Sequence, residues 1–87
     1  MRPEELEILK GLRGTAFQSF FPTGRSIAQA EAFDALVESL EGMRQSGWIE
    51  LEVSPSGVQV GNYRRKYRAA VARCTDAGRE ALRLLGE

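Results

Sequence analysis

Residues 47–85 read GWIELEVSPSGVQVGNYRRKYRAAVARCTDAGREALRLL. Apolar and acidic side chains alternate over 49–53, which is the period of two expected for a strand with one buried and one exposed face. The SPSG sequence that follows favours a turn, because proline fixes φ and glycine accepts a positive φ. The stretch therefore predicts an antiparallel β-hairpin with strands over 48–54 and 67–74, joined by a long tip.

A helix is expected directly after the hairpin. Thr75 offers a hydroxyl for the N-cap, and Ala81, Leu82 and Leu85 share one face of a helix over 75–86. Cys74, between apolar neighbours and this cap, is predicted to point into the core and to react slowly, because buried apolar thiols are inert.

Three helices are predicted before the hairpin. Near the start, a proline followed by two glutamates suits the first turn of a helix over 3–13. Phenylalanines spaced i, i+3 and i+4 favour a short helix over 15–21, whose aromatic side would be either core or a ligand-binding shelf. Ser26 and Gln29 form a capping-box pattern that opens a helix over 26–46.

The helix over 26–46 has three distinct faces. An apolar stripe is predicted to face the core. An acidic stripe lies on one flank and a stripe of small residues, which permits close helix approach, lies on the other. The apolar stripe is Phe33, Leu36, Val37, Leu40 and Met43; the acidic stripe is Glu31, Asp34, Glu38 and Glu41; the small stripe is Ala28, Ala32, Ala35 and Ser39.

Length and composition exclude several classes of protein. Eighty-seven residues are enough for one domain, 1–87, with a modest core. One cysteine and no histidine exclude an internal disulfide, histidine-based nucleophilic pairs and ordinary zinc sites. The acidic start lacks an apolar run, and no segment approaches the roughly 20 apolar residues of a membrane span. We therefore expect a cytoplasmic protein that is not an enzyme, with no metal, no cofactor and no membrane contact.

Charge is balanced overall but unevenly distributed. Residues 1–52 carry five basic and nine acidic side chains, whereas residues 53–87 carry seven basic and three acidic ones. The zero net charge is not a nucleic-acid signature, since such domains are usually clearly basic. The basic half is still suited to local contact with phosphate or with the acidic half of a second copy.

Residues 33–85 resemble the wing and following helix of winged-helix proteins of the MarR and PadR type. The resemblance rests on a helix that runs into residues 47–49, a hairpin with a basic tip, and the sequence CTDAGREAL at 74–82. Those families usually have Leu-Thr-x-x-Gly-Arg there, and Cys74 is a small apolar replacement for the leucine. The resemblance implies an α+β winged-helix fold and a transcription-regulator function in which the wing contacts DNA.

The resemblance makes the basic tip the best candidate for contact with DNA phosphates. The alternative is a solvated tip whose charges only keep the hairpin soluble. The helix over 26–46 departs from the family pattern, because a helix-turn-helix reader has two short helices and because an acidic surface repels phosphate. We therefore expect nonspecific contact with the backbone of duplex DNA. The candidate residues are Arg64, Arg65, Lys66 and Arg68 at the tip, and Arg25, Ser26 and Gln29 at the start of the helix.

A homodimer is the expected assembly, and a protein-interaction module without sequence-specific DNA binding is the alternative function. Strand parity predicts an apolar patch on the outer face of the hairpin, and such patches usually mark interfaces. On the same face, Glu50 and Glu52 are expected to pair with an arginine such as Arg73 rather than to act in catalysis. The predicted interface residues are Trp48, Tyr67 and Val71, with Ala28, Ala32 and Ala35 from the small stripe.

Overall fold

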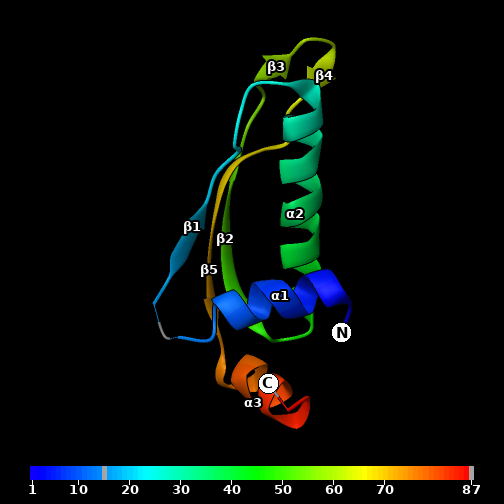
Figure 1. Ribbon diagram of the computed structural model, residues 1–87. Helices are drawn as coiled ribbons and strands as arrows, with labels where there is room; N and C mark the ends of the chain where they lie inside the picture. The colour runs from blue at the N-terminus through cyan, green and yellow to red at the C-terminus, as the bar shows by residue number, and fades with distance from the viewer. Residues whose placement is uncertain (15, 87) are drawn as a thin grey trace.

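The computed structural model describes residues 1–14 and 16–86 as an elongated α+β domain with extents of 43 × 21 × 19 Å. Within those residues, one helix covers one face of an antiparallel sheet, two helices lie at one end of it, and the tip of its long hairpin lies at the other end (Figure 1). The helices are α1 (Pro3–Gly11), α2 (Ile27–Gln45) and α3 (Asp76–Leu84), and the strands are β1 (Gln18–Phe20), β2 (Ile49–Pro55), β3 (Gln59–Val60), β4 (Tyr63–Arg64) and β5 (Tyr67–Cys74).

Strands β2 and β5 form the long hairpin, and β1 pairs with the other edge of β5, so that the order is β1-β5-β2. Ile49 lies opposite Cys74, and both are 2% exposed. The next pair, Glu50 and Arg73, lies on the other face and forms an ion pair. The predicted hairpin and its cross-strand pair are therefore confirmed.

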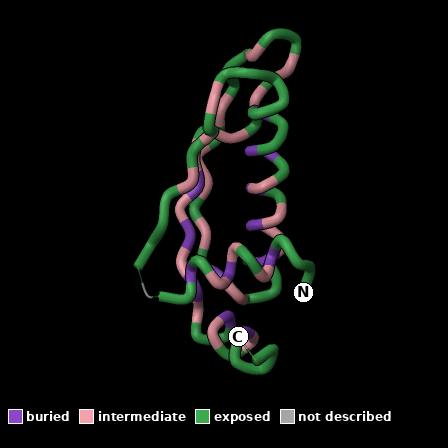
Figure 2. The backbone as a smooth tube through the Cα atoms, viewed as in Figure 1, coloured by how far each residue is buried: buried purple, intermediate pink, exposed green. Residues whose placement is uncertain are grey.

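Helix α2 lies along the inner face of the sheet and supplies a large part of the core. Val37, Leu40 and Met43 are completely buried, as the apolar stripe predicts. Ala70 and Ala72 of β5 face the helix from the sheet, and their small side chains leave room for it to approach. Figure 2 shows that buried positions concentrate where α2, α1 and the sheet face one another, whereas the far end of the hairpin contains exposed and half-buried residues.

The opposite end of the domain is closed by α1 and α3, which contact each other. The Thr75 hydroxyl accepts a hydrogen bond from the Gly78 amide at 3.0 Å and donates one to the Gly47 carbonyl at 2.6 Å. This N-cap therefore also fastens the start of α3 to the chain that leaves α2. The helix starts predicted at Pro3, Ser26 and Thr75 are confirmed within a residue.

Gly78 allows α3 to pack closely against this corner. The residue is buried, and a Cβ at this position would overlap the Trp48 carbonyl oxygen and lie 2.9 Å from the Cys74 sulfur. Any larger residue would therefore push α3 away from the hairpin base.

The prediction of a helix over 15–21 is wrong. Thr15 itself lies outside the described residues. Strand β1 occupies this region and pairs with β5. Phe20 packs against the core, whereas Phe17 and Phe21 are 53% and 63% exposed, so the aromatic rings do not share one buried side. The free edge of β5 offers backbone hydrogen-bonding partners, and aromatic residues suit strands, so a tertiary contact overrides the helical spacing.

The tip predicted as a loop contains a second, small hairpin formed by β3 and β4. Two backbone hydrogen bonds join the segment before β3 to the segment after β4. The Ser56 amide donates to the Lys66 carbonyl at 2.9 Å, and the Arg65 amide donates to the Val58 carbonyl at 3.0 Å. The tip is therefore an ordered extension of the long hairpin.

The apolar patch predicted on the outer face of the hairpin does not form. Tyr67 and Trp48 both pack against the core, whereas Val71 lies opposite Glu52 on the outer face. The pairing of β2 with β5 is irregular between Ser54 and Pro55, and this changes the face on which Tyr67 lies. Trp48 lies before the first residue of β2 and is not bound by the alternation of the strand. Strict alternation does not hold at either position.

Candidate functional site

The tip is fastened to α2 by one buried carboxylate. Asp34 is 3% exposed and accepts hydrogen bonds from the Tyr63 hydroxyl, from the Lys66 amide at 3.1 Å and from the Tyr67 amide at 3.3 Å. Burial of a carboxylate is costly unless donors surround it, and here the tip supplies all three. The basic tip therefore has a defined position relative to the helix.

Sequence reasoning missed this role, because it placed Asp34 on an exposed acidic flank. The sequence did contain an indication that Asp34 is buried. On a helix it neighbours Ala30, four residues before it, and Val37, three residues after it, and both are buried. A carboxylate at the border of an apolar stripe requires donors from elsewhere in the chain.

This arrangement changes the pKa of the Tyr63 phenol. The hydrogen bond to Asp34, together with burial and the nearby charges of Asp34, Glu31 and Glu38, raises the pKa of Tyr63 to about 12. Ionisation of the phenol would remove the donor and place a second negative charge beside the carboxylate. The contact between the tip and α2 is therefore made by neutral tyrosine.

Two of the predicted tip cations have partners within the domain. The Lys66 ammonium lies 3.2 Å from a Glu38 carboxylate oxygen, and the Arg65 Nη2 donates to the Gly24 carbonyl at 3.3 Å. The Arg65 Nε is buried and has no acceptor among the described residues. Lys66 is therefore partly neutralised, whereas Arg65 keeps unused donor capacity.

The two polar candidates at the start of α2 serve the helix itself. The Ser26 hydroxyl accepts from the Gln29 amide at 3.1 Å, and the Gln29 side chain accepts from the Ser26 amide at 3.2 Å. Both side chains are exposed, but their hydrogen bonds are already made. They have less freedom than the neighbouring arginines to follow a ligand.

Three arginines at this end are exposed and have no hydrogen bond or ion pair within residues 1–14 and 16–86. These are Arg25 before α2, Arg64 in β4 and Arg68 in β5. The structure thus separates the seven predicted DNA-binding residues into a free set of these three and an engaged set of four.

The predicted interface residues are also separated. Ala28, Ala32 and Ala35 are exposed on α2, and Ala32 borders a hollow together with Phe21 and Thr23. Trp48 and Tyr67 are half-buried against the core, and Val71 is half-buried on the outer face of the sheet.

A cavity also lies at the base of the hairpin, away from the tip. It has a volume of about 490 Å³ and is bordered by Cys74 together with the charged residues Glu50, Arg73, Asp76 and Arg79. Cys74 is buried, and burial raises the pKa of its thiol. A protonated, buried thiol is a poor nucleophile, so the cavity lacks an activated cysteine.

Residues 1–14 and 16–86 contain no group of three or more histidine, cysteine, aspartate or glutamate side chains placed to hold a metal ion. No helix in the described part of the chain combines the length and the apolar character needed to cross a membrane. No protein-family description, curated protein or solved structure matches this chain.

Proposed function

We propose that this chain is a small winged-helix-like domain that binds duplex DNA by its phosphate backbone, with the β2–β5 hairpin as the wing. The observation that carries the proposal is the free set of arginines, Arg25, Arg64 and Arg68, at the end of the domain where Asp34 holds the tip. Free guanidinium groups on a fixed support can form charge-assisted, bidentate hydrogen bonds to phosphate without first breaking an internal pair.

The arrangement of the sheet supports the winged-helix part of the proposal. The resemblance implies a helix that runs into a long hairpin and a further helix directly after it, and here α2, the β2–β5 hairpin and α3 follow one another in that order. The expected second helix is replaced by β1, and α2 runs without a break over 19 residues. A pair of helices that reads bases in the major groove is therefore missing, which favours contact with the backbone.

The charges on α2 define the direction from which DNA would approach. Glu31 and Glu38 are exposed on the helix and would repel phosphates that lay along it. Arg64 and Arg68 lie on the hairpin instead. Phosphates are therefore expected on the hairpin arginines rather than along the exposed face of α2.

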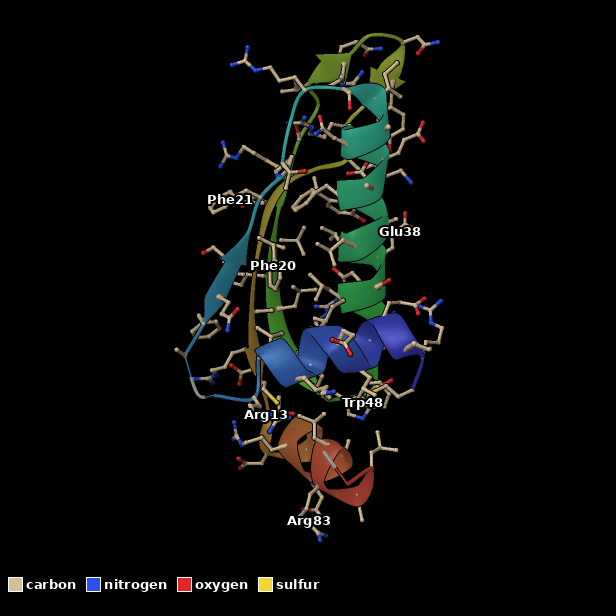
Figure 3. All side chains as sticks on the ribbon, viewed as in Figure 1. Arg13, Phe20, Phe21, Glu38, Trp48 and Arg83 are labelled. Atoms are coloured by element: carbon tan, nitrogen blue, oxygen red, sulfur yellow. The ribbon has the colours of Figure 1, made fainter. Side chains whose placement is uncertain are left out.

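The test replaces Arg64 and Arg68 together by glutamine and measures duplex DNA affinity at several salt concentrations. Removing two phosphate contacts should lower the slope of log K against log salt by about 2. The matched control is Arg13→Gln with Arg83→Gln, which removes the same charge at the opposite end (Figure 3).

Wild-type protein that does not bind duplex DNA at low salt refutes the proposal. Equal loss of affinity in the tip and control variants would show that only total charge matters, and it would contradict the assignment to the tip. Circular dichroism on both variants checks that each remains folded.

A homodimer through the small stripe of α2 is the second candidate, favoured by the exposure of Ala28, Ala32 and Ala35. Small side chains allow two helices to approach closely, and the acidic flank of one copy would meet the basic tip of the other in a two-fold arrangement. Sedimentation of wild type and Ala32→Glu tests it: a dimer that becomes monomeric in the variant supports this face, and a monomeric wild type at tens of micromolar refutes it.

A further inference from the structure

A separate cleft lies between the small hairpin at the tip and the start of α2, which are neighbours in Figure 1. It has a volume of about 370 Å³ and is lined by Arg25, Arg65, Val58, Gln59, Val60 and Gly61. Pockets that hold small molecules begin at about 300 Å³, so the cleft is large enough for a ligand of that class.

The turn between β3 and β4 creates this cleft by lying directly against α2. Gly61 adopts a φ of +59°, and a Cβ there would lie 2.9 Å from the Ile27 Cδ1 atom. Glycine therefore meets both the backbone conformation and the close approach. Together with the hydrogen bonds to Asp34, this contact holds the two walls of the cleft in place.

Two arginines with unused donors line the cleft. Arg25 is exposed and has no hydrogen bond or ion pair within residues 1–14 and 16–86. Arg65 makes one long hydrogen bond, to the Gly24 carbonyl at 3.3 Å, and its buried Nε has no acceptor among the described residues. A buried donor without an acceptor is costly, and a small rotation of the side chain toward an anion would satisfy it.

The other lining residues suit the body of a ligand rather than its charge. Val58 is 57% exposed and Val60 is half-buried, which provides an apolar surface, and Gln59 supplies both a donor and an acceptor. The capping box already uses the amides of Ser26 and Gln29, so the arginines are the source of attraction for an anion.

We propose that this cleft binds a phosphate monoester of nucleotide size, with the phosphate between Arg25 and Arg65 and the body against Val58 and Val60. Two arginines match the geometry and charge of a phosphate, and an apolar wall with one amide matches a base or another small ring system. The cleft shares Arg25 with the proposed DNA contact, but Arg64 and Arg68 do not line it, so substitutions at those two residues separate the two proposals.

The experiment titrates isotopically labelled protein with adenosine monophosphate, adenosine and inorganic phosphate, and follows the amide resonances. Adenosine monophosphate should bind with a Kd below about 1 mM and shift resonances of residues 25–27 and 58–61. Adenosine and inorganic phosphate, which each lack half of the ligand, should bind at least about ten-fold more weakly. A short single-stranded oligonucleotide with and without a terminal phosphate distinguishes a free nucleotide from a strand end as the source.

Two substitutions and one control identify the residues. Arg65→Gln and Arg25→Gln should each weaken adenosine monophosphate binding by about ten-fold to a hundred-fold, the effect of losing a charged hydrogen bond. Arg13→Gln removes an exposed arginine at the other end of the domain and should leave the affinity unchanged. Arg64→Gln with Arg68→Gln should also leave it unchanged while reducing duplex DNA binding.

Several results would overturn the inference. Absence of saturable binding near 1 mM refutes the site, and so does binding that survives both cleft substitutions. Inorganic phosphate that binds as tightly as adenosine monophosphate refutes the nucleotide-sized ligand. Because duplex DNA affinity is measured on the same proteins, failure of this site and failure of the proposed DNA contact are separate observations.

Discussion

The two ends of the β2–β5 hairpin are held in place by different forces. At the base, fully buried apolar side chains such as Leu9, Leu40 and Met43 pack from two helices and the sheet. At the tip, the principal anchor is the carboxylate of Asp34, which accepts hydrogen bonds from one side chain and two amides. Apolar burial is distributed over many contacts, whereas a polar anchor depends on each donor and acceptor. A substitution in the apolar core at the base should lower the stability of the whole fold. A substitution at Asp34 should loosen only the tip.

The largest effect is expected from a truncation in the base core. Leu40→Ala removes a completely buried side chain and should reduce the free energy of unfolding by about 2–5 kcal/mol. A chain of 87 residues has a total of roughly 4–13 kcal/mol, so the substitution would remove a large share of the stability. Urea denaturation measures the change. Leu84→Ala is the matched control, because Leu84 is 71% exposed, and a comparable loss there would contradict a core confined to the inner face.

A second substitution tests the close approach of α3 to the hairpin base. Gly78→Ala should destabilise the fold by about 1–3 kcal/mol, since the added carbon overlaps the Trp48 carbonyl oxygen. The control is Gly42→Ala in α2, where a Cβ has no neighbour within 4 Å. That change should stabilise the fold by up to about 1 kcal/mol because alanine favours a helix. Thermal melts of both variants measure the difference, and the same sign for both would disprove the steric explanation.

The tip anchor should produce an effect confined to the tip. Asp34→Asn keeps the shape of the side chain but replaces an acceptor oxygen by a donor. The contact between the tip and α2 should therefore lose about 1–3 kcal/mol of stability. Hydrogen exchange should accelerate at the amides of Lys66 and Tyr67 while the β2–β5 pairing near Ile49 stays protected. Glu38→Gln is the control, because it removes only an exposed ion pair with Lys66, worth about 0–1 kcal/mol. Uniform loss of protection in Asp34→Asn would mean that tip and base unfold together.

The smallest effect is a pH dependence confined to the tip. Since the pKa of Tyr63 is raised from 10.0 to about 12, folding favours the neutral phenol. Its stabilising contribution is fully present below pH 10 and is lost as the pH rises through about 12. Tyrosinate absorbance should show one late titration that disappears in Tyr63→Phe. A wild-type titration in which Tyr63 ionises near its ordinary value of 10.0 would contradict the hydrogen bond to Asp34.

Local patterns were sufficient for the regular elements at the base. The alternation over 49–53, the Ser26 capping box and the Thr75 cap each act through neighbouring residues, and each appears in the structure where it was predicted. Strand parity also placed Cys74 in the core and Glu50 opposite Arg73. These features depend on backbone geometry and on which side of an element is apolar, and both are written in short stretches of sequence.

The candidate site was only partly predictable. Its basic residues are evident in the sequence as a cluster, but their availability is not. Lys66 is paired because folding brings it against Glu38, 28 residues away on α2. Arg64 is free because its guanidinium lies beside Gly57, which has no side-chain acceptor. The cleft beside Arg65 depends likewise on a turn at Gly61 that lies against Ile27.

The sequence by itself determined the long hairpin, the amphipathic α2 and the caps of the helices, because periodicity and capping act over a few residues. Only the tertiary structure decided that Gln18–Phe20 form a strand, that Tyr67 faces the core and that Asp34 anchors the tip. Each of these depends on a partner distant in sequence: the free edge of β5, the irregular pairing beside Pro55, and the donors of the 63–67 segment. A donor or an edge becomes available only when the chain has folded, so no local pattern can specify it.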